Sequence, residues 1–340
     1  ETPPLTNIVQ VEAGQSHTCA RDGEGQVWCW GDNGWGQLGQ VGMRFSPHPL
    51  EVAGLGPVVE LAAGGDRTCA IEQSGLVKCW GYGPLGDGTE ETSAKPVGVR
   101  VKADIVDLEL GDYHMCGRSS KGDLYCWGSN YMGELGLGNR RDRGLPTKIP
   151  GVRNPTSVMT TVYRTCVHNA KGQVQCTGTN VSGQLGDGTR RTKTRLTKVV
   201  ATSQPSRKLV GGIRYTCSLT QAGTVECWGP VPGVGDVGIR AKPLPDLRPQ
   251  LTGYLQALAA NPGPQTFESC ERKAPTRRTL QDPPLATLPT GTTGTLAAGH
   301  DHDCYVVDRR TVSCWGRNDH GQVGDGTTSF RPKPHPVVLP

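Results

Sequence analysis

Aromatic side chains are scarce in this sequence, where Phe, Trp and Tyr make up 5% of 340 residues. The chain also has no apolar run of 18 or more residues and no long stretch in which apolar residues recur every 3.6 positions. The lack of a long apolar run excludes a transmembrane helix, and the lack of helical periodicity argues against a helical bundle. Glycine, by contrast, reaches 48 residues, about twice its average share, which favours short strands joined by many turns. We therefore expect an all-β protein.

The charge balance is modest. The chain has 36 basic and 31 acidic residues and a formal net charge of +5, below the basic excess expected of a nucleic-acid-binding domain. It begins at Glu1 without the basic and apolar regions of a signal peptide, so we expect a soluble mature chain or an excised domain. We expect no nucleic-acid partner and no membrane span.

Thirteen cysteines are present, and all but one fall into pairs separated by ten positions. The residues between them, such as "ARDGEGQVW" and "SLTQAGTVE", have polar or glycine-rich centres and alternating flanks, which predicts tight β-hairpins. The pairs are Cys19 with Cys29, Cys69 with Cys79, Cys116 with Cys126, Cys166 with Cys176, Cys217 with Cys227 and Cys304 with Cys314. Cys270 is left over and is either an unreactive buried thiol or a reactive or intermolecular one.

The spacing of the cysteines favours disulfides. Directly opposed residues in a hairpin lie about 4.5 to 5.5 Å apart at Cα, within the range that a disulfide bridges. Metal binding is the alternative, but it usually uses closely spaced pairs such as C-x-x-C, and the spacing here is C-x9-C. We predict that each pair staples one hairpin and that the protein works in an oxidising compartment: secreted, periplasmic or at the cell surface.

The cysteine pairs belong to a longer repeat. Segments such as "VEAGQSHTC" and "LAAGGDRTC" lead to the first cysteine, and segments such as "CWGDNGWGQLGQ" and "CWGRNDHGQVGDGT" begin at the second. A further unit from Leu258 keeps the opening "LAAN" but has neither paired cysteines nor Trp-Gly. Including it gives seven units of about 40 to 50 residues, the period of propeller blades. We expect one domain, residues 1–340, with a degenerate sixth blade around residues 256–295.

The two ends of the chain complete the same pattern. Writing the C-terminal "PKPHPVVLP" before the N-terminal "LTNIVQVEAG" regenerates the junction found between internal units. We expect the N- and C-terminal segments to close the ring by completing the last blade together, which removes an open sheet edge.

The repeats resemble those of the regulator of chromosome condensation (RCC1) family, whose pattern is AAG-x-x-H-T-x-A, a hairpin, then C/Y-x-W-G-x-N-x-x-G-Q-L-G. The resemblance covers nearly the whole chain and implies a seven-bladed β-propeller. The paired cysteines depart from the nuclear founder of the family, a nucleotide-exchange factor that binds chromatin. In this respect the chain is more similar to extracellular bacterial members, which include a secreted inhibitor that caps β-lactamases with one propeller face.

Two columns of residues vary between the repeats and are the candidate binding positions. One comprises the residues just before the first cysteines, and the other follows Trp-Gly. The resemblance to the secreted inhibitor implies that these columns form a partner-binding face; ordinary polar turns are the alternative. The predicted partner-binding residues are Trp35, Asp66, Tyr82, Tyr113, Tyr131, Met132, Tyr163, Arg214, Asp301 and His320.

Other recurring residues are interpreted as parts of the blade. Tryptophan after the second cysteine is expected to pack between blades. Histidine recurs at His17, His114 and His302, where we expect hydrogen bonding within a blade rather than metal binding. Two basic stretches, "TRRTKTRLTK" from Thr189 and "ERKAPTRR" from Glu271, are either solvated loops or sites for anionic surfaces.

No G-x-S-x-G, H-E-x-x-H or P-loop motif is present, so we expect no enzyme activity, no cofactor and no metal. The prediction is a monomeric extracytoplasmic scaffold that binds a protein partner through one propeller face and inhibits a secreted or periplasmic enzyme. A glycan or an anionic surface is the alternative partner. The alternative function is a propeller enzyme or glycan-binding protein with its site at the central channel.

Overall fold

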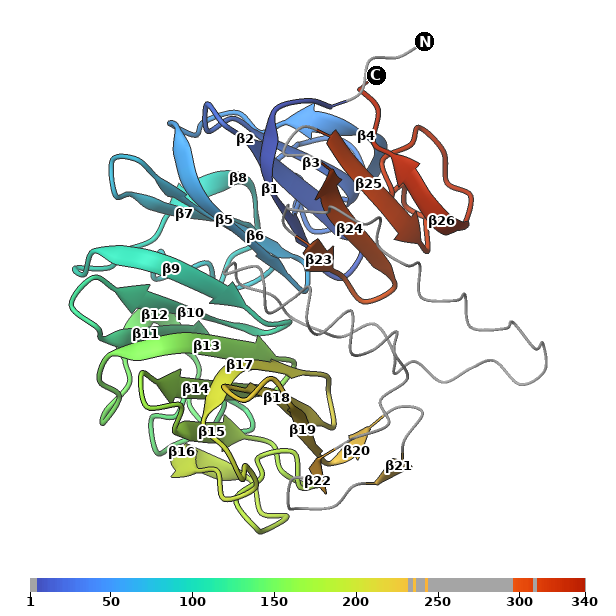
Figure 1. The fold of residues 1–340 in the computed structure, drawn as a ribbon. Helices are drawn as coiled ribbons and strands as arrows, with labels where there is room; N and C mark the ends of the chain where they lie inside the picture. The colour runs from blue at the N-terminus through green and yellow to red at the C-terminus, as the bar shows by residue number, and fades with distance from the viewer. Residues whose placement is uncertain (1–4, 232–234, 237–241, 244–295, 308–310, 340) are drawn as a thin grey trace.

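The computed structural model describes residues 5–231, 235–236, 242–243, 296–307 and 311–339. The chain in these ranges forms strands and no helix, so it offers no helix long and apolar enough to cross a membrane. Six four-stranded antiparallel sheets follow one another around a ring (Figure 1). Five of them are built from four strands consecutive along the chain, and in the fifth sheet β20 and β21 intervene between the third and fourth strands. The all-β prediction is confirmed.

Each sheet has an inner strand facing the ring's centre and an outer strand at its rim. The first two sheets contain β1 (Ile8–Ala13), β2 (His17–Asp22), β3 (Val27–Asp32), β4 (Phe45–Glu51), and β5 (Val58–Gly64), β6 (Arg67–Glu72), β7 (Val77–Gly81), β8 (Ser93–Gly98). The next two contain β9 (Ile105–Leu110), β10 (His114–Ser119), β11 (Leu124–Gly128), β12 (Arg143–Lys148), and β13 (Pro155–Thr161), β14 (Arg164–Asn169), β15 (Val174–Gly178), β16 (Lys193–Lys198). The last two contain β17 (Ser206–Gly211), β18 (Thr216–Thr220), β19 (Val225–Trp228), β22 (Lys242–Pro243), and β23 (Leu296–Ala298), β24 (His302–Val307), β25 (Thr311–Gly316), β26 (Arg331–Pro336). A two-stranded sheet joins β20 (Pro230–Val231) to β21 (Gly235–Asp236).

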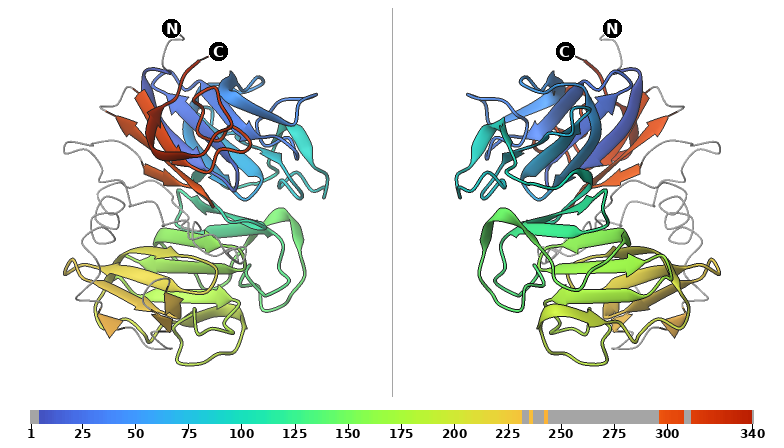
Figure 2. Two further views of the ribbon diagram at one scale, coloured as in Figure 1. Left: turned by 90° about the vertical axis from the view of Figure 1, so that its right-hand side faces the viewer. Right: turned by 90° about the vertical axis from the view of Figure 1, so that its left-hand side faces the viewer.

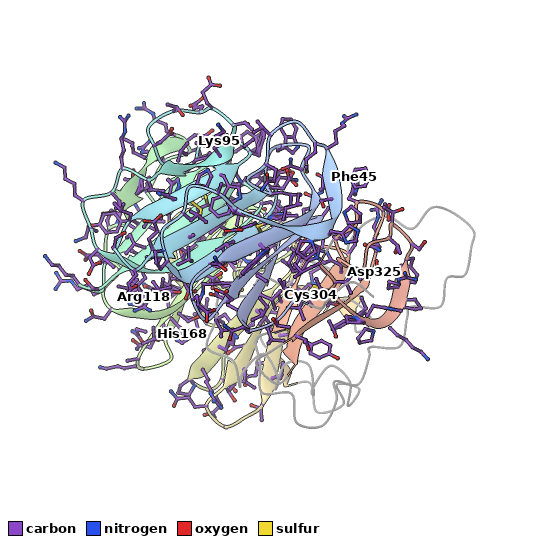
Figure 3. The ribbon with its side chains drawn as sticks, turned by 90° about the horizontal axis from the view of Figure 1, so that it is seen from above. Phe45, Lys95, Arg118, His168, Cys304 and Asp325 are labelled. Carbon is purple, nitrogen blue, oxygen red and sulfur yellow. A yellow bond between two sulfur atoms is a disulfide. The ribbon has the colours of Figure 1, made fainter. Side chains whose placement is uncertain are left out.

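The predicted disulfides are all present. In each sheet the two cysteines are directly opposed on the second and third strands, as for Cys19 and Cys29, whose Cα atoms are 4.1 Å apart. The other five pairs have Cα separations of 4.0 or 4.1 Å. Seen from above, Cys304 lies within the last sheet, whereas Phe45 and Lys95 belong to the outer strands β4 and β8 (Figure 3). The hairpin interpretation of the cysteine spacing is therefore confirmed.

The Trp-Gly motif shapes the third strand. The pairing between the third and fourth strands shifts register between Cys29 and Gly31, and equivalent shifts occur in four other sheets. Gly31 has φ of +102°, and a Cβ atom there would lie 2.6 Å from the carbonyl oxygen of Ser16. Only glycine fits both the backbone conformation and this close approach, which explains why it recurs after the tryptophan.

The recurring threonine, tryptophan and glutamine join neighbouring blades. The backbone carbonyl of Gln37 accepts hydrogen bonds from Thr68 Oγ1 and from the buried Trp80 Nε1, both at 2.9 Å. Two further junctions repeat this arrangement: Gln322 with Thr18 and Trp30, and Gln184 with Thr216 and Trp228. The prediction that tryptophan packs between blades is confirmed, and the tryptophan also donates a hydrogen bond across the junction.

The recurring histidines also act between blades. His17 Nε2 lies 2.9 Å from Thr68 Oγ1 in the next blade, and His114 Nε2 lies 2.7 Å from Thr165 Oγ1. The third pair is His302 with Thr18. Burial lowers the pKa of each of the three histidines to about 3, so they are neutral at physiological pH. Hydrogen bonding was expected within a blade, but the bonds run to the neighbouring blade.

The prediction of seven blades is wrong, because the described residues form a ring of six four-stranded sheets. The features that build each sheet are a cysteine pair across the central strands and, in most sheets, Trp-Gly after the second cysteine. The unit from Leu258 has neither, and only its opening segment resembles the repeat. The predicted sixth blade around residues 256–295 lies outside the described residues.

The expected mode of ring closure is also wrong. The strands β1–β4 come from the N-terminal part alone and β23–β26 from the C-terminal part alone, so among the described residues no sheet is completed by both ends. The ends instead meet beside these sheets, where Leu5 N donates to Val337 O at 3.3 Å and both side chains join one buried cluster. In both views of Figure 2 the blue segment that leads into β1 and the red segment that follows β26 lie close together. The inner strand β1 then packs against β24 on one side and β5 on the other.

Candidate protein-binding face

The two variable columns lie at the same end of the propeller. In five blades a backbone hydrogen bond of 2.7–2.9 Å joins the two columns. The donor is the N–H of the residue after Trp-Gly or Thr-Gly, and the acceptor is the carbonyl of the third residue before the first cysteine. These pairs are Asp32 with Ser16, Tyr82 with Asp66, Ser129 with Tyr113, Thr179 with Tyr163 and Arg317 with Asp301. We call this end the loop face. The hairpin turns between the second and third strands lie at the opposite end.

Aromatic side chains from adjacent blades contact each other on the loop face. Trp35 meets Tyr82 edge-on, with ring centroids 4.8 Å apart, and Tyr113 stacks on Tyr163 at 5.3 Å. Trp35 is 49% exposed, and Tyr131 is 67% exposed. The structure thus brings five of the predicted residues onto one surface as two pairs and an isolated tyrosine.

Acidic side chains lie between these aromatic pairs. Gln37 Nε2 donates to Asp32 Oδ2 at 2.9 Å and to Asp66 Oδ1 at 3.4 Å. Burial raises the pKa of Asp66 to about 6, and the negative charges of Asp32 and Asp112 add to this rise. Arg67 is buried, lies 5.4 Å from the centroid of the Tyr82 ring and offsets the rise only in part. An additional positive charge nearby would therefore stabilise the ionised form of Asp66.

One polar contact joins distant blades at this end. His300 lies just before β24, and Asp112 lies just before β10. The Nε2 atom of His300 is 3.1 Å from the Oδ1 atom of Asp112. The two residues are 188 positions apart in the sequence. His302, two residues further on, bonds to Thr18 at a blade junction. The contact ties the last blade to the third.

The remaining predicted residues have defined places on the same end. Arg214 Nε donates to Ser182 Oγ at 3.2 Å and so links the loops of two blades. Asp301 pairs with Arg317 at 3.2 Å. Met132 and His320 are half-buried at the tips of their loops. Each of the ten predicted residues is thus described, and each lies in one of the two columns.

Sequence reasoning missed the residues that hold these loop tips. Gln37 Oε1 accepts the backbone N–H of Trp35 at 2.9 Å, and Glu134 Oε2 accepts that of Met132 at 2.7 Å. Two other loops use Gln184 with Ser182 and Gln322 with His320. The recurring "GQLG" and "GELG" segments contain this signal, since a buried amide or carboxyl two positions after a loop tip can fix its backbone.

Carboxyl groups on the inner strands lie at the centre of the ring. Gln10 Nε2 donates to Glu12 Oε1 at 3.1 Å and to Leu61 O at 2.8 Å, which ties β1 to β5. Burial raises the pKa of Glu12 well above its ordinary value and that of Glu60 to about 7. Burial lowers the pKa of Lys208 to about 8. Within the described ranges, no group of three or more His, Cys, Asp or Glu side chains is arranged to hold a metal ion.

Comparisons with known proteins agree with this architecture. Human WBSCR16 has a solved structure that is 19% identical, with a TM-score of 0.65, over 98% of this chain and 83% of that one. Yeast RCC1 (Prp20), solved bound to Kap60, is 20% identical with a TM-score of 0.62, over 97% of this chain and 74% of that one. At these identities the similarity shows the fold alone. No curated protein sequence matches. The family model described as the RCC1-like domain matches residues 1–340, and the chain therefore belongs to the RCC1-like domain family.

Proposed function

We propose that this protein is an extracytoplasmic scaffold that binds a partner protein through its loop face. The observation that carries the proposal is the set of exposed and half-buried aromatic side chains at one end of the ring, where Trp35 contacts Tyr82 and Tyr113 stacks on Tyr163. Tryptophan and tyrosine are enriched among the residues that dominate binding energy at interfaces, because they bury large areas and still form hydrogen bonds.

The loops that carry these side chains are held in place before any partner arrives. The amide of Asn33 bonds to carbonyls of its own loop, and its Oδ1 accepts the N–H of Leu38 at 3.0 Å. Gln37 then fixes the backbone of Trp35. A rigid surface loses less conformational entropy on association, so more of the contact energy appears as affinity.

The disulfides support a location outside the cytoplasm. One disulfide closes the central hairpin of every blade. Such a number is typical of proteins from oxidising compartments, where thiols are not kept reduced. A partner in the same compartment is a secreted, periplasmic or surface protein, and inhibition of a secreted or periplasmic enzyme is the most specific form of the proposal.

Family relatives are consistent with binding rather than catalysis. Yeast RCC1 (Prp20) has been solved in complex with Kap60, and a second structure, of Prp20p from Saccharomyces cerevisiae, concerns its binding to Gsp1p and histones. These partners belong to those proteins. What this chain shares with them is the propeller, and its own variable residues define the surface that we assign to binding.

Affinity capture from envelope and secreted fractions of the source organism tests the proposal. The immobilised native protein is compared with the double variant Trp35→Ala, Tyr131→Ala. The control is Leu76→Ala, Val59→Ala, which removes two exposed apolar side chains (58% and 48% exposed) far from the loop face. We expect a protein that the native chain and the control retain and the aromatic variant loses. Retention by all three proteins, or by none, contradicts the proposal.

A further inference from the structure

Two segments on the rim of the third and fourth blades concentrate the basic charge of the chain. Residues 139–148 and 189–198 together contain nine basic residues and one acidic residue, a formal excess of eight. The formal net charge of the whole chain is only +5, so everything outside these segments is slightly acidic. The basic residues are Arg140, Arg141, Arg143, Lys148, Arg190, Arg191, Lys193, Arg195 and Lys198. We call this surface the basic rim.

The blade architecture does not require this charge. The equivalent loop of the first blade has one basic residue, Arg44, and that of the second blade has Glu90 and Glu91. All of these loops lead to outer strands of the same kind, which begin at residues 45 and 93. The equivalent segment of the last described blade has two basic residues, Arg331 and Lys333, so the basic excess is greatest in two adjacent blades.

Protection of a sheet edge explains only part of the pattern. Outer strands carry a proline at Pro49, Pro96 and Pro146, whereas β16 has Leu196 at that place. Charged side chains are another way to protect an exposed edge, which accounts for basic residues within β16. It does not account for Arg140 and Arg141, which lie in a loop before a strand that already has its proline.

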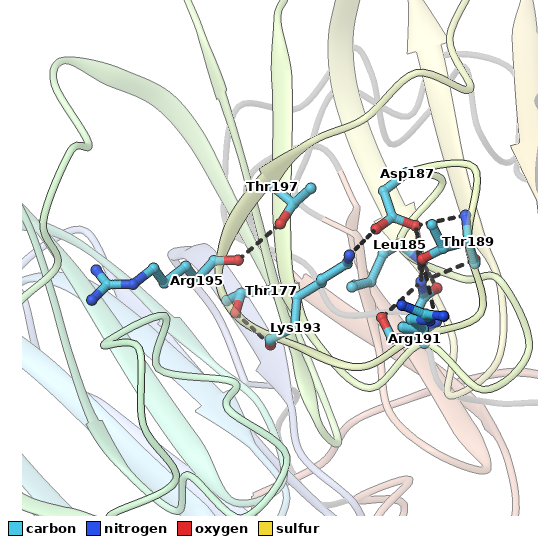
Figure 4. Close-up of polar contacts among 9 residues, drawn as sticks. Thr177, Leu185, Asp187, Thr189, Arg191, Lys193, Arg195 and Thr197 are labelled. Atoms are coloured by element: carbon cyan, nitrogen blue, oxygen red, sulfur yellow. Dashed lines mark hydrogen bonds and ion pairs between the residues drawn. The ribbon is translucent and has the colours of Figure 1, made fainter.

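The two segments form one continuous surface. The loop of the third blade is attached to β16, because Gly138 N donates to Thr194 O at 2.6 Å and Leu137 bridges to Arg195. Figure 4 shows Lys193 directed to Asp187, with which it forms an ion pair at 3.2 Å, while Arg195 points away from that cluster. Of the loop arginines, Arg140, Arg141, Arg190 and Arg191 are exposed, as is Arg195.

We propose that the basic rim binds an acidic polysaccharide, through the sulfate or carboxylate groups along a single glycan chain. The planar guanidinium of arginine matches both of these groups with paired hydrogen bonds, and arginine predominates here. Neither segment contains an aromatic residue, so the stacking platforms used by single-stranded nucleic acid are missing. The slightly acidic remainder of the chain repels a wide polyanion such as duplex DNA more than a narrow chain lying along the rim. The start of the basic rim lies at the same end of the propeller as the loop face, since Arg143 pairs with Gly128. The proposal rests on the charge of the rim and does not depend on the loop-face proposal.

Elution from immobilised glycans tests this inference. The probes are heparin, which carries sulfates, and polygalacturonate, which carries only carboxylates. The variant Arg141→Gln, Arg191→Gln, Arg195→Gln removes three exposed charges from the basic rim, and the control Lys95→Gln, Arg100→Gln, Lys102→Gln removes three exposed charges from the second blade. Both variants have the same net charge, so any difference between them depends on position.

We expect the native protein and the control to bind at least one of the two glycans and to elute at similar salt concentrations. The rim variant should elute at clearly lower salt, and its plot of log affinity against log salt should be shallower by roughly two to three units. Equal shifts in both variants would assign the effect to net charge alone and overturn the proposal. Absence of binding to both glycans, or tighter binding to duplex DNA at the same salt concentration, would overturn it as well.

Discussion

Two tryptophans at equivalent positions should respond differently to the same substitution. Trp80 donates its indole N–H to Gln37 O at 2.9 Å, whereas the buried Trp127 Nε1 has no hydrogen-bond partner among the described residues. The loops that face the two indoles also differ in sequence: the loop opposite Trp127 is shorter and has Pro84 in the place of Gln37. Replacing either tryptophan by phenylalanine removes similar ring atoms, so the packing cost is common to both variants.

The hydrogen bond then determines the difference. Trp80→Phe loses a buried hydrogen bond worth about 1 kcal/mol, although Gln37 O keeps Thr68 Oγ1 as a donor. Trp127→Phe removes a buried N–H that is already unsatisfied, and the loss of its desolvation penalty stabilises the folded state by about 1 kcal/mol or more. Trp80→Phe should therefore destabilise the protein by about 2 kcal/mol more than Trp127→Phe. Urea unfolding with the disulfides intact measures this as a lower midpoint at an unchanged m-value. Equal midpoints, or a greater loss for Trp127→Phe, would refute the assignment of this hydrogen bond to blade junctions.

Three further outcomes follow from the structure. Gly324→Ala should lower the midpoint of thermal unfolding more than Gly42→Ala. Both glycines have positive φ, but a Cβ at Gly324 would lie 2.6 Å from Trp30 Nε1, while nothing lies within 4 Å of a Cβ at Gly42. Equal decreases in the midpoint would contradict this. Burial lowers the pKa of His114 to about 3, so on acidification below pH 6.5 the unfolded chain takes up a proton that the folded protein does not, and the free energy of unfolding falls. Between pH 7.5 and 5 the His114→Gln variant should therefore lose about 2 kcal/mol less free energy of unfolding than the native protein, and parallel pH profiles would argue against a neutral buried histidine. Thiol titration of denatured, unreduced protein should detect about one thiol out of thirteen cysteines, and detection of about thirteen would rule out the disulfides and the oxidising compartment.

Local pattern was enough to predict the hairpins and their disulfides. Directly opposed strand residues must lie close together, so the spacing of Cys19 and Cys29 carries the geometry by itself. The predicted blade number is wrong because the opening segment from Leu258 resembles the repeat but is followed by neither the cysteine pair nor Trp-Gly. An inner-strand segment alone supplies only one of the four strands that a blade needs.

Comparison of the repeats predicts which residues belong to the candidate face, but not how their side chains contact each other. Residues that vary between repeats marked Trp35 and Tyr113, but the pairing of their rings depends on the angle between blades, which one sequence does not reveal. The contact of Asp112 with His300 joins residues 188 positions apart and has no local signal. The position of the basic loop of the third blade against β16 likewise depends on packing between blades.

The most direct test of the central claim is isothermal titration calorimetry of a captured partner against three proteins. These are the native chain, Trp35→Ala with Tyr131→Ala, and the control Leu76→Ala with Val59→Ala. The loop-face account predicts that the aromatic variant loses at least about 100-fold in affinity, since buried aromatic anchors often contribute 2 kcal/mol or more each, while the control binds like the native protein. Native affinity in the aromatic variant, or an equal loss in the control, would contradict the claim that the loop face binds the partner.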